Sequence, residues 1–493
     1  MAWISVDAGT SVIKAVVFTD DGREFALARE NTAVLSPHPG FAEQDMNSVW
    51  SAVLSTVRRA TRQLPEPIRG LVTTAQGDGC WLVDASGYPT GNAILWNDGR
   101  ALAIVDTWRD AGIIERAFRI SGSVTYPGLP NAILHWLAQN EPARIDKARW
   151  SLTCNGWLFS RLTGLFLADL SDGSNPFSDV NAAVYSPDLL RLYGQEDRAY
   201  LLPPIRIGTD LVAPLTACAA EQLGLPIGTP VVMAPYDIVA TAYGCGSVSP
   251  GQACVILGTT ICAEAITSSL DLDVTPTGTT IALGNGSYLR AMPTLTGCEA
   301  FTWATKALSC ESIPELDRLA ATSVAGANGL LFLPYLSLAG ERSPFLEPDA
   351  RGSFIGLSLT HTRADMARSI YEGLTFVIRD CIKAAAGTLP LELRVCGGGA
   401  RSDFWCQIIA DVIGVPIVRT EDSEVGARGA FLFALAVTGA TPSVHDAVRQ
   451  YVTAAKTFLP SSALHALYSE RFDLFLQQRA LSLPQWRLHA GRV

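Results

Sequence analysis

Apolar and polar residues alternate in short blocks along the first fifty positions. Residues 3–6 are apolar, a small polar turn with the sequence DAGTS follows at 7–11, and a second apolar run occupies 13–18. Apolar runs of this length on either side of a glycine-containing turn predict two strands joined by a hairpin. Apolar residues at helical spacing from Asn47 onward then predict a helix.

The same block pattern returns near the midpoint of the chain. Residues 253–257 are apolar, the turn at 258–260 reads GTT, and 261–266 are apolar again. Two copies of a strand–turn–strand pattern predict a duplicated domain, with both turns facing a shared cleft. Short Gly-Thr hairpins are common, so this symmetry needs support from other motifs.

The composition is typical of large folded domains. Of the 493 residues, 48% are hydrophobic and 17% are charged, which predicts two or three domains with sizeable cores. The SVSPG run at 247–251 is typical of a linker turn. We therefore expect one domain at 1–246 and a second at 247–493.

Charge and cysteine usage exclude several classes of protein. The formal net charge of −10 argues against a nucleic-acid partner, whose phosphates need neutralising. The 11 cysteines show no C-x-x-C spacing, which argues against a zinc or dithiol site and favours a reducing compartment. The N-terminus lacks a signal peptide pattern, and no apolar run approaches the ~20 residues of a membrane helix. We expect a cytoplasmic protein with no membrane contact.

The first hairpin turn is a candidate phosphate site. A glycine turn between strands exposes backbone N–H groups that can hold phosphate oxygens. Asp7 at the strand end is suited to Mg²⁺, and Lys14 adds a positive charge nearby. An ordinary hairpin with an Asx turn explains the same residues, so the turn alone does not decide between the two interpretations.

A run of three glycines is the second candidate. Residues 395–402 read VCGGGARS, so a strand ends in glycines and a helix capped by Ser402 follows. Consecutive glycines let the backbone approach a flat or charged ligand closely. The spacing matches neither the Walker A nor the Rossmann pattern. The alternative is a flexible strand-to-helix turn.

Two further sets carry polar chemistry. Asp237 follows the apolar strand 231–234 and precedes a small-residue helix, where a carboxylate can accept a proton from a substrate hydroxyl. A plain helix N-cap is the alternative. The second set combines a tryptophan with amide, carboxylate and guanidinium groups and is suited to a polyhydroxylated ligand. The alternative interpretation is that these are polar turn residues around a tryptophan of the core. The members of this set are Gln76, Asp78, Trp96, Asn97, Asp98 and Arg100.

Taken in order, these motifs resemble the FGGY family of carbohydrate kinases. The resemblance runs from Asp7 to about Gly439 and includes a segment at 333–357 that is close to a family signature. It implies an α/β fold of two duplicated ribonuclease-H-like, actin-like ATPase domains that flank a central cleft. The N-terminal domain would bind the sugar and the C-terminal domain the nucleotide.

The resemblance also implies a role for each motif. ATP and Mg²⁺ would serve in-line transfer to a primary hydroxyl, with Asp237 as the catalytic base and Asp7 organising the metal. The residues implied in ATP binding are Asp7, Gly9, Thr10, Ser11, Lys14, Gly258, Thr259, Thr260, Gly297, Gly397, Gly398, Gly399, Ala400 and Ser402. Those implied in substrate binding are Gln76, Gly77, Asp78, Trp96, Asp98 and Asp237.

The residues after Gln76 bear on the substrate. Xylulokinases usually have Met-His there and glycerol kinases Arg-Glu, whereas this chain has Gly77-Asp78. The motifs at 7–16, 76–79 and 339–342 look most like erythritol kinase, while 35–43 and 91–95 look like L-xylulose kinase. The expected substrate is therefore a four- or five-carbon polyol or ketose.

Other outputs of the same fold stay open at this point. An actin-like or chaperone-type ATPase would use ATP for a conformational change, but it would not need the polar set around Trp96. An inactive sensor is disfavoured by Asp7 and Asp237. The expected partners are a small sugar or polyol and ATP, without nucleic acid or membrane, and a homodimer is compatible with the sequence.

Overall fold

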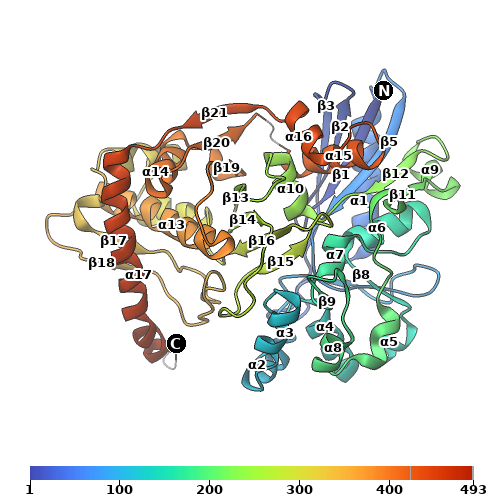
Figure 1. Cartoon of the computed structure of the whole chain (residues 1–493), viewed down its shortest axis with the longest axis horizontal. Helices are drawn as coiled ribbons and strands as arrows, with labels where there is room; N and C mark the ends of the chain where they lie inside the picture. The colour runs from blue at the N-terminus through green and yellow to red at the C-terminus, as the bar shows by residue number, and fades with distance from the viewer. Residues whose placement is uncertain (422–423, 491–493) are drawn as a thin grey trace. The chain divides into compact units, whose positions relative to one another are not determined.

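A computed structural model describes residues 1–421 and 424–490 (Figure 1). The chain forms two compact units that alternate along the sequence. The first unit comprises Met1–Val248, Ser268–Leu289 and Glu424–Val452. The second comprises the described parts of Ser249–Thr267, Arg290–Ser423 and Thr453–Val493.

The chain first leaves the first unit after Val248, inside the 247–251 run where the sequence predicts a linker turn. It returns to that unit twice, in the segments 268–289 and 424–452. Both segments belong to the half that the sequence assigns to the second domain. The sequence pattern cannot reveal this difference, because membership of a unit is decided by contacts between segments far apart along the chain.

A six-stranded mixed sheet forms the centre of the first unit, in the order β11-β12-β5-β1-β2-β3. β1 pairs antiparallel with β2 and parallel with β5, and β5 pairs parallel with β12. The predicted first hairpin and the helix after it are both confirmed. The strands are β1 Ala2–Ala8, β2 Val12–Thr19, β3 Glu24–Asn31, β5 Ile68–Ala75, β11 Val212–Pro214 and β12 Pro230–Met233.

Each face of this sheet buries a separate apolar core, because successive strand residues point to opposite sides. Trp3 and Val16 lie on one face, where they pack against helices from the returning segment 424–452. The coloured chain in Figure 1 shows these red helices beside the blue strands. They are α15 Val425–Val437 and α16 Val444–Tyr451, whereas α1 Met46–Thr61, α6 Cys154–Thr163 and α9 Ala217–Leu223 supply side chains to the core of the other face.

Helix α10, Asp237–Cys245, packs against α15 at unusually short range. A Cβ atom built on Gly429 would lie 1.7 Å from the Ala240 carbonyl oxygen, and one on Gly244 would lie 1.9 Å from that of Val425. Only glycine allows the two backbones to approach this closely. This contact fixes the helix that begins at Asp237.

A helical layer with its own core completes the first unit between 76 and 211. Its helices are α2 Leu102–Asp110, α3 Ile113–Ser121, α4 Pro130–Asn140, α5 Pro142–Lys147, α7 Leu170–Ser174 and α8 Pro187–Leu192. Short strands join it, namely β4 Glu43–Gln44, β6 Trp81–Val83, β7 Ala93–Ile94, β8 Trp150–Leu152, β9 Ser178–Asp179 and β10 Val184–Tyr185, and β15 Thr279–Ala282 comes from a returning segment.

The second unit repeats the central topology of the first. The sheet of this unit contains the strand order β16-β14-β13-β19-β20-β21, and the hairpin β13–β14 is followed by the parallel neighbours β19 and β20. The order β2-β1-β5-β12 in the first unit is the same arrangement, which confirms the predicted duplication. The strands are β13 Ala253–Leu257, β14 Ile261–Thr267, β16 Tyr288–Pro293, β17 Leu331–Leu333, β18 Ser353–Ile355, β19 Leu393–Cys396, β20 Ile417–Thr420 and β21 Ala454–Phe458.

Five helices cover the sheet of the second unit and bury its core. The long helix α13 begins at Arg363, and Asp365 accepts a hydrogen bond from the backbone N–H of Thr362 at 2.8 Å, which caps its first turn. The helices are α11 Glu299–Ala307, α12 Ile313–Ala321, α13 Arg363–Ala386, α14 Asp403–Ile413 and α17 Ser462–Ala490. Within the described part of the chain, no helix combines the length and apolarity needed to cross a membrane.

Candidate active site

The end of the first hairpin places a carboxylate beside a lysine. Asp7 and Lys14 are paired across β1 and β2, with 3.7 Å between Lys14 Nζ and Asp7 Oδ2. Glu424, immediately before α15, lies closer to the lysine, at 2.9 Å, and also pairs with Arg29. The Glu424 side chain is almost fully buried. Glu424 therefore holds Lys14 at the mouth of the turn, a role that the sequence analysis missed.

Burial and neighbouring charges shift the proton affinities of these groups. Burial raises the pKa of Asp7, and Lys14 opposes that change. Burial alone would lower the pKa of Lys14, but the carboxylates of Asp7 and Glu424 outweigh it, so the pKa of Lys14 is raised. The lysine is therefore a permanent positive charge next to the glycine turn.

Thr10 connects the predicted phosphate turn to the predicted sugar site. Its hydroxyl donates to Gln76 Oε1 at 2.6 Å and accepts from Trp96 Nε1 at 3.0 Å. Gln76 in turn donates from Nε2 to Gln44 Oε1 at 2.8 Å, and only 3% of Gln76 is exposed. Gln76 is thus held by hydrogen bonds at both ends of its amide, and it positions the turn.

Asp78 has a strained backbone and a fixed carboxylate. Its φ angle is +55°, in the left-handed region that non-glycine residues rarely adopt. The Tyr126 hydroxyl donates to Asp78 Oδ2 at 2.6 Å, and Asn175 Nδ2 donates to Oδ1 at 3.2 Å. Both oxygens are therefore oriented by the protein. No local sequence signal pointed to Tyr126 or Asn175, because they are 48 and 97 residues away from Asp78.

Gly77 is required by the residue next to Asp237. A Cβ atom built on Gly77 would lie 2.3 Å from the ring of Tyr236. Tyr236 is the N-cap residue of α10, and its backbone N–H donates to Ser171 Oγ at 3.0 Å. The glycine therefore lets the loop that carries Asp78 pack directly against the start of α10.

Asp237 is the first residue of α10, so it is not the N-cap that the sequence allowed as an alternative. The connection before it is held rigidly, because the Thr74 hydroxyl donates to the Pro235 carbonyl oxygen at 2.7 Å. Asn155 Nδ2 donates to the Ala234 carbonyl oxygen at 2.6 Å. The carboxylate of Asp237 is therefore presented at a defined place at the end of β12.

The electrostatic environment of Asp237 is unusual for a carboxylate. Burial and, next to it, the charge of Asp7 raise its pKa to about 8, although the Ile238 backbone N–H acts in the opposite direction. Asp78 also raises this pKa, whereas Lys14 lowers it. Asp7, Asp78, Lys14 and Asp237 thus form one interacting cluster in the first unit. Carboxyl groups with such shifts are typical of functional sites.

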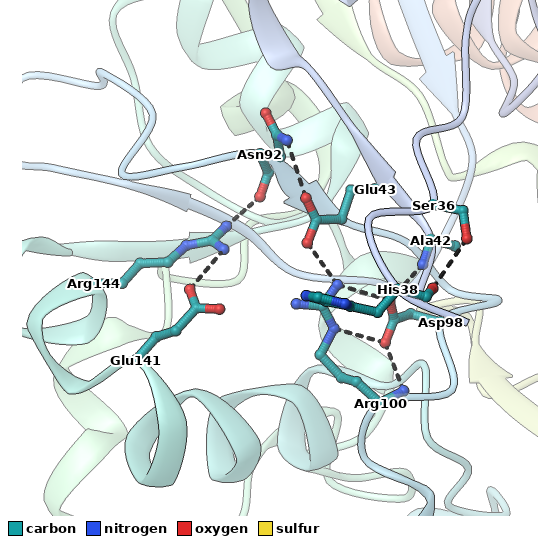
Figure 2. A network of polar contacts seen from close by, with 9 residues as sticks. All are labelled: Ser36, His38, Ala42, Glu43, Asn92, Asp98, Arg100, Glu141 and Arg144. Atoms are coloured by element: carbon teal, nitrogen blue, oxygen red, sulfur yellow. Dashed lines mark hydrogen bonds and ion pairs between the residues drawn. The ribbon is translucent and has the colours of Figure 1, made fainter. Parts of the chain in front are cut away.

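Asp98 lies in a separate buried network (Figure 2). Asp98 Oδ2 accepts from the Ala42 backbone N–H at 2.6 Å, and Oδ1 accepts from Arg100 Nε at 2.8 Å. Arg100 also pairs with Glu43 at 2.7 Å and lies over the ring of Phe41, 4.1 Å from its centroid. Both oxygens of Asp98 thus accept hydrogen bonds from protein groups, and these bonds hold the 40–43 segment in place.

The second unit contains a cavity of about 740 Å³. It includes five of the residues predicted to bind ATP: Gly258, Thr259, Gly398, Gly399 and Ser402. The other lining residues are Leu257, Cys298, Glu299, Phe301, Thr302, Ile313, Pro314, Asp317, Tyr371, Arg401 and Trp405. The cavity lining is adjoined in sequence by four more residues predicted to bind ATP, namely Thr260, Gly297, Gly397 and Ala400. A Cβ atom on Gly297 would lie 2.5 Å from the Thr260 carbonyl carbon.

The three consecutive glycines have different surroundings. Gly397 has a φ of +87°, and a Cβ atom there would lie 2.8 Å from the Leu257 carbonyl oxygen. A Cβ atom on Gly399 would lie 2.5 Å from the Trp405 ring. Gly398 has no atom within 4 Å of its Cβ position and lines the cavity. Gly397 and Gly399 are thus needed for packing, whereas Gly398 leaves space for a ligand.

Comparison with known proteins identifies a family that spans both units. The model of the N-terminal domain of the FGGY family of carbohydrate kinases matches residues 2–244, and the model of its C-terminal domain matches 253–437. The chain is 33% identical to an erythritol kinase of Brucella abortus, covering 99% of this chain and 98% of the relative. It is 31% identical to an L-xylulose/3-keto-L-gulonate kinase of Escherichia coli, with 96% and 95% covered.

Solved structures give the same result. A xylulose kinase from Rhodospirillum rubrum superimposes with a TM-score of 0.90 at 26% identity, covering 99% of this chain and all of the other. A ligand-bound xylulose kinase from Lactobacillus acidophilus shares the fold, with a TM-score of 0.93 at 24% identity and 98% of each chain covered. These matches confirm the predicted fold class. They also confirm the predicted kinase activity, in preference to an ATPase that would use ATP for a conformational change. The chain belongs to the FGGY family of carbohydrate kinases and is an ATP-dependent carbohydrate kinase.

Proposed function

We propose that the protein phosphorylates a primary hydroxyl of a four- or five-carbon polyol or ketose, with Asp237 as the catalytic base. The observation that carries the proposal is that the protein holds two carboxylates, Asp237 and Asp78, in place near enough to interact electrostatically. Asp237 is held at the start of α10, and Asp78 is oriented by Tyr126 and Asn175. The relatives named erythritol kinase and L-xylulose/3-keto-L-gulonate kinase support this substrate class.

Each reacting group has a candidate partner in the first unit. Asp237 would take the proton of the substrate hydroxyl as that oxygen bonds to the γ-phosphorus, while the bond from this phosphorus to the β–γ bridging oxygen breaks. The backbone N–H groups of the 9–11 turn and the charge of Lys14 would hold phosphate oxygens. The cavity of the second unit would bind the adenosine.

The residues around Asp7 fit a bound Mg²⁺. Gly426 faces the carboxylate, and a Cβ atom there would lie 3.3 Å from Asp7 Oδ2, so the absence of a side chain leaves room. No cluster of three or more His, Cys, Asp or Glu suited to a metal occurs in the described residues. Mg²⁺ is commonly held by one or two carboxylates, water and substrate phosphates, which matches a single Asp7. When bound, it would offset charge on the phosphoryl group.

Asp78 favours a polyol over a ketose. An ionised carboxylate accepts hydrogen bonds but donates none, so it pairs with substrate hydroxyls and repels a carbonyl oxygen. The Tyr126 hydroxyl donates to one oxygen of Asp78 and Asn175 Nδ2 donates to the other, so the protein fixes the orientation of this carboxylate. Two adjacent hydroxyls of a polyol such as erythritol would match this arrangement.

A substrate screen tests the proposal. Sugar-dependent ADP release would be measured with erythritol, xylitol, D-xylulose, L-xylulose and glycerol at saturating Mg-ATP. We expect the highest kcat/KM among the four- and five-carbon compounds, with erythritol ahead of the ketoses. A preference for a ketopentose would overturn the Asp78 argument alone, whereas release that no small sugar or polyol stimulates would overturn the proposed substrate class.

Asp78→Ala is expected to raise the KM for the sugar far more than the KM for ATP. Loss of a hydrogen-bonding partner for a substrate hydroxyl typically costs about tenfold or more in kcat/KM. Asn175→Ala is the graded control, because it removes only one group that orients Asp78. A similar rise in both KM values would show that Asp78 supports the fold instead of the substrate.

The activity should also fall at low pH. A base must be ionised, and burial together with Asp7 raises the pKa of Asp237 to about 8 in the free protein. We expect kcat/KM for the sugar to rise with pH and to level off at or below about pH 8, since Mg²⁺ beside Asp7 would weaken the repulsion. A pH–rate profile checks this, and a flat profile between pH 5.5 and 9 would contradict it.

A further inference from the structure

The cavity of the second unit contains a carboxylate with an unusually well-defined orientation. Asp317 lies on α12 and lines the cavity, although no motif in the sequence points to it. Ser402 Oγ donates to Asp317 Oδ2 at 2.7 Å, and the Tyr371 hydroxyl donates to Oδ1. The carboxylate is therefore held at both oxygens by hydroxyl groups from two other helical segments.

The two hydroxyl groups are themselves committed to this orientation. Ser402 Oγ accepts from the Trp405 backbone N–H at 3.1 Å as the cap of α14, so its own hydrogen is directed to Asp317. Tyr371 is fully buried, and burial followed by Asp317 raises the pKa of its hydroxyl. Tyr371 therefore keeps its proton and donates it to Asp317.

The remaining capacity of Asp317 specifies its ligand. An ionised carboxylate has about four acceptor positions, and the protein uses one at each oxygen. Each oxygen of Asp317 therefore keeps one acceptor position for a ligand, and the carboxylate offers the ligand no hydrogen-bond donor. A pair of adjacent hydroxyl groups matches this arrangement. The edge of adenine matches less well, because a ring nitrogen that can only accept adjoins its amino group.

We infer that Asp317 binds the 2′,3′-diol of the ribose of the nucleotide and so selects ribonucleotides over deoxynucleotides. This inference rests on the proposed nucleotide role of the cavity. The bare backbone at Gly398 lines the same cavity and leaves the space that an adenosine needs. Carboxylates recognise ribose hydroxyls in the same way in dinucleotide-binding folds. Asp317 would contact the ribose of the nucleotide and not its base.

The test measures nucleotide binding to the full-length protein by calorimetry, without turnover. ADP, 2′-deoxy-ADP, 3′-deoxy-ADP and GDP would be titrated into the wild type and into Asp317→Asn, which preserves the shape of the side chain. We expect the wild type to bind ADP about tenfold or more tightly than either deoxynucleotide. In Asp317→Asn the ADP affinity should fall to nearly that of the deoxynucleotides, with the ratio of ADP to GDP unchanged.

A matched control lies on the same helix. Glu315→Gln removes a carboxylate from α12 at a residue that does not line the cavity, and it should leave the discrimination intact. Melting curves confirm that each variant is folded. An unchanged preference for ADP over the deoxynucleotides in folded Asp317→Asn would overturn the inference, as would a change confined to the ratio of ADP to GDP, which would indicate base recognition.

Gly398→Val distinguishes an error in the ribose contact from an error in the proposed nucleotide site. If ADP binds and Gly398→Val weakens it, while Asp317→Asn keeps full discrimination, the ribose contact alone is wrong. If Gly398→Val leaves ADP affinity unchanged in a folded protein, the cavity is not the nucleotide site and the inference falls with it.

Discussion

Asp237→Asn is expected to lose almost all sugar phosphorylation while it still binds nucleotide. The amide has nearly the shape of the carboxylate but cannot accept a proton, and removal of a general base typically costs ~10²–10⁴-fold in kcat. The rigid connection before Asp237 should hold the amide in the same place. Steady-state kinetics gives the loss in kcat, and turnover near the wild-type value would rule out the role.

Stability measurements separate this effect from unfolding. The pKa of Asp237 is raised from 3.8 to about 8 in the folded protein, so between these values the native state binds more protons than the unfolded chain. The fold therefore loses stability as pH rises through that window. Asn has no proton to lose, so the variant should be at least as stable as the wild type at pH 8.

Gly398→Val is expected to weaken ATP and ADP binding by about tenfold or more, which corresponds to ~1.4 kcal/mol. Of the three consecutive glycines, only Gly398 has open space at its Cβ position and a φ outside the left-handed region. A branched side chain there would occupy the cavity without disturbing the backbone. Calorimetry with each nucleotide measures the change.

Gly398→Ala provides the graded control. One methyl group takes less of the cavity, so its effect on affinity should be smaller than that of valine, and the melting temperature of both variants should stay close to the wild type. Nucleotide affinity that remains unchanged in folded Gly398→Val would remove this segment from the binding site.

The sequence predicted the elements whose signal is local. The hairpins at 3–18 and 253–266 appear as β1–β2 and β13–β14, because apolar runs on either side of a glycine turn determine them directly. Ser402 caps α14 as its position suggested. The place of Asp237 after an apolar strand is confirmed by the end of β12 and the start of α10.

The partners of the site residues could not be predicted, because they come from distant segments. Tyr126 and Asn175 orient Asp78, and Glu424 holds Lys14, across separations that no periodic pattern encodes. The residue type alone also does not show whether a polar side chain is free to bind a ligand or already forms hydrogen bonds within the protein. Gln76 and Asp98 looked equally available in the sequence, yet protein donors and acceptors engage both.

The segment 424–452 has a consequence for how the protein is made. One face of the first sheet, including Trp3 and Val16, is covered by α15 and α16. The ribosome adds these helices only after nearly all of the intervening chain has been translated. Until then, the nascent first unit carries an uncovered apolar surface, which is the kind of surface that chaperones bind and that promotes aggregation. Cutting the gene after Val248 would make this temporary exposure permanent, so the N-terminal half should be insoluble on its own.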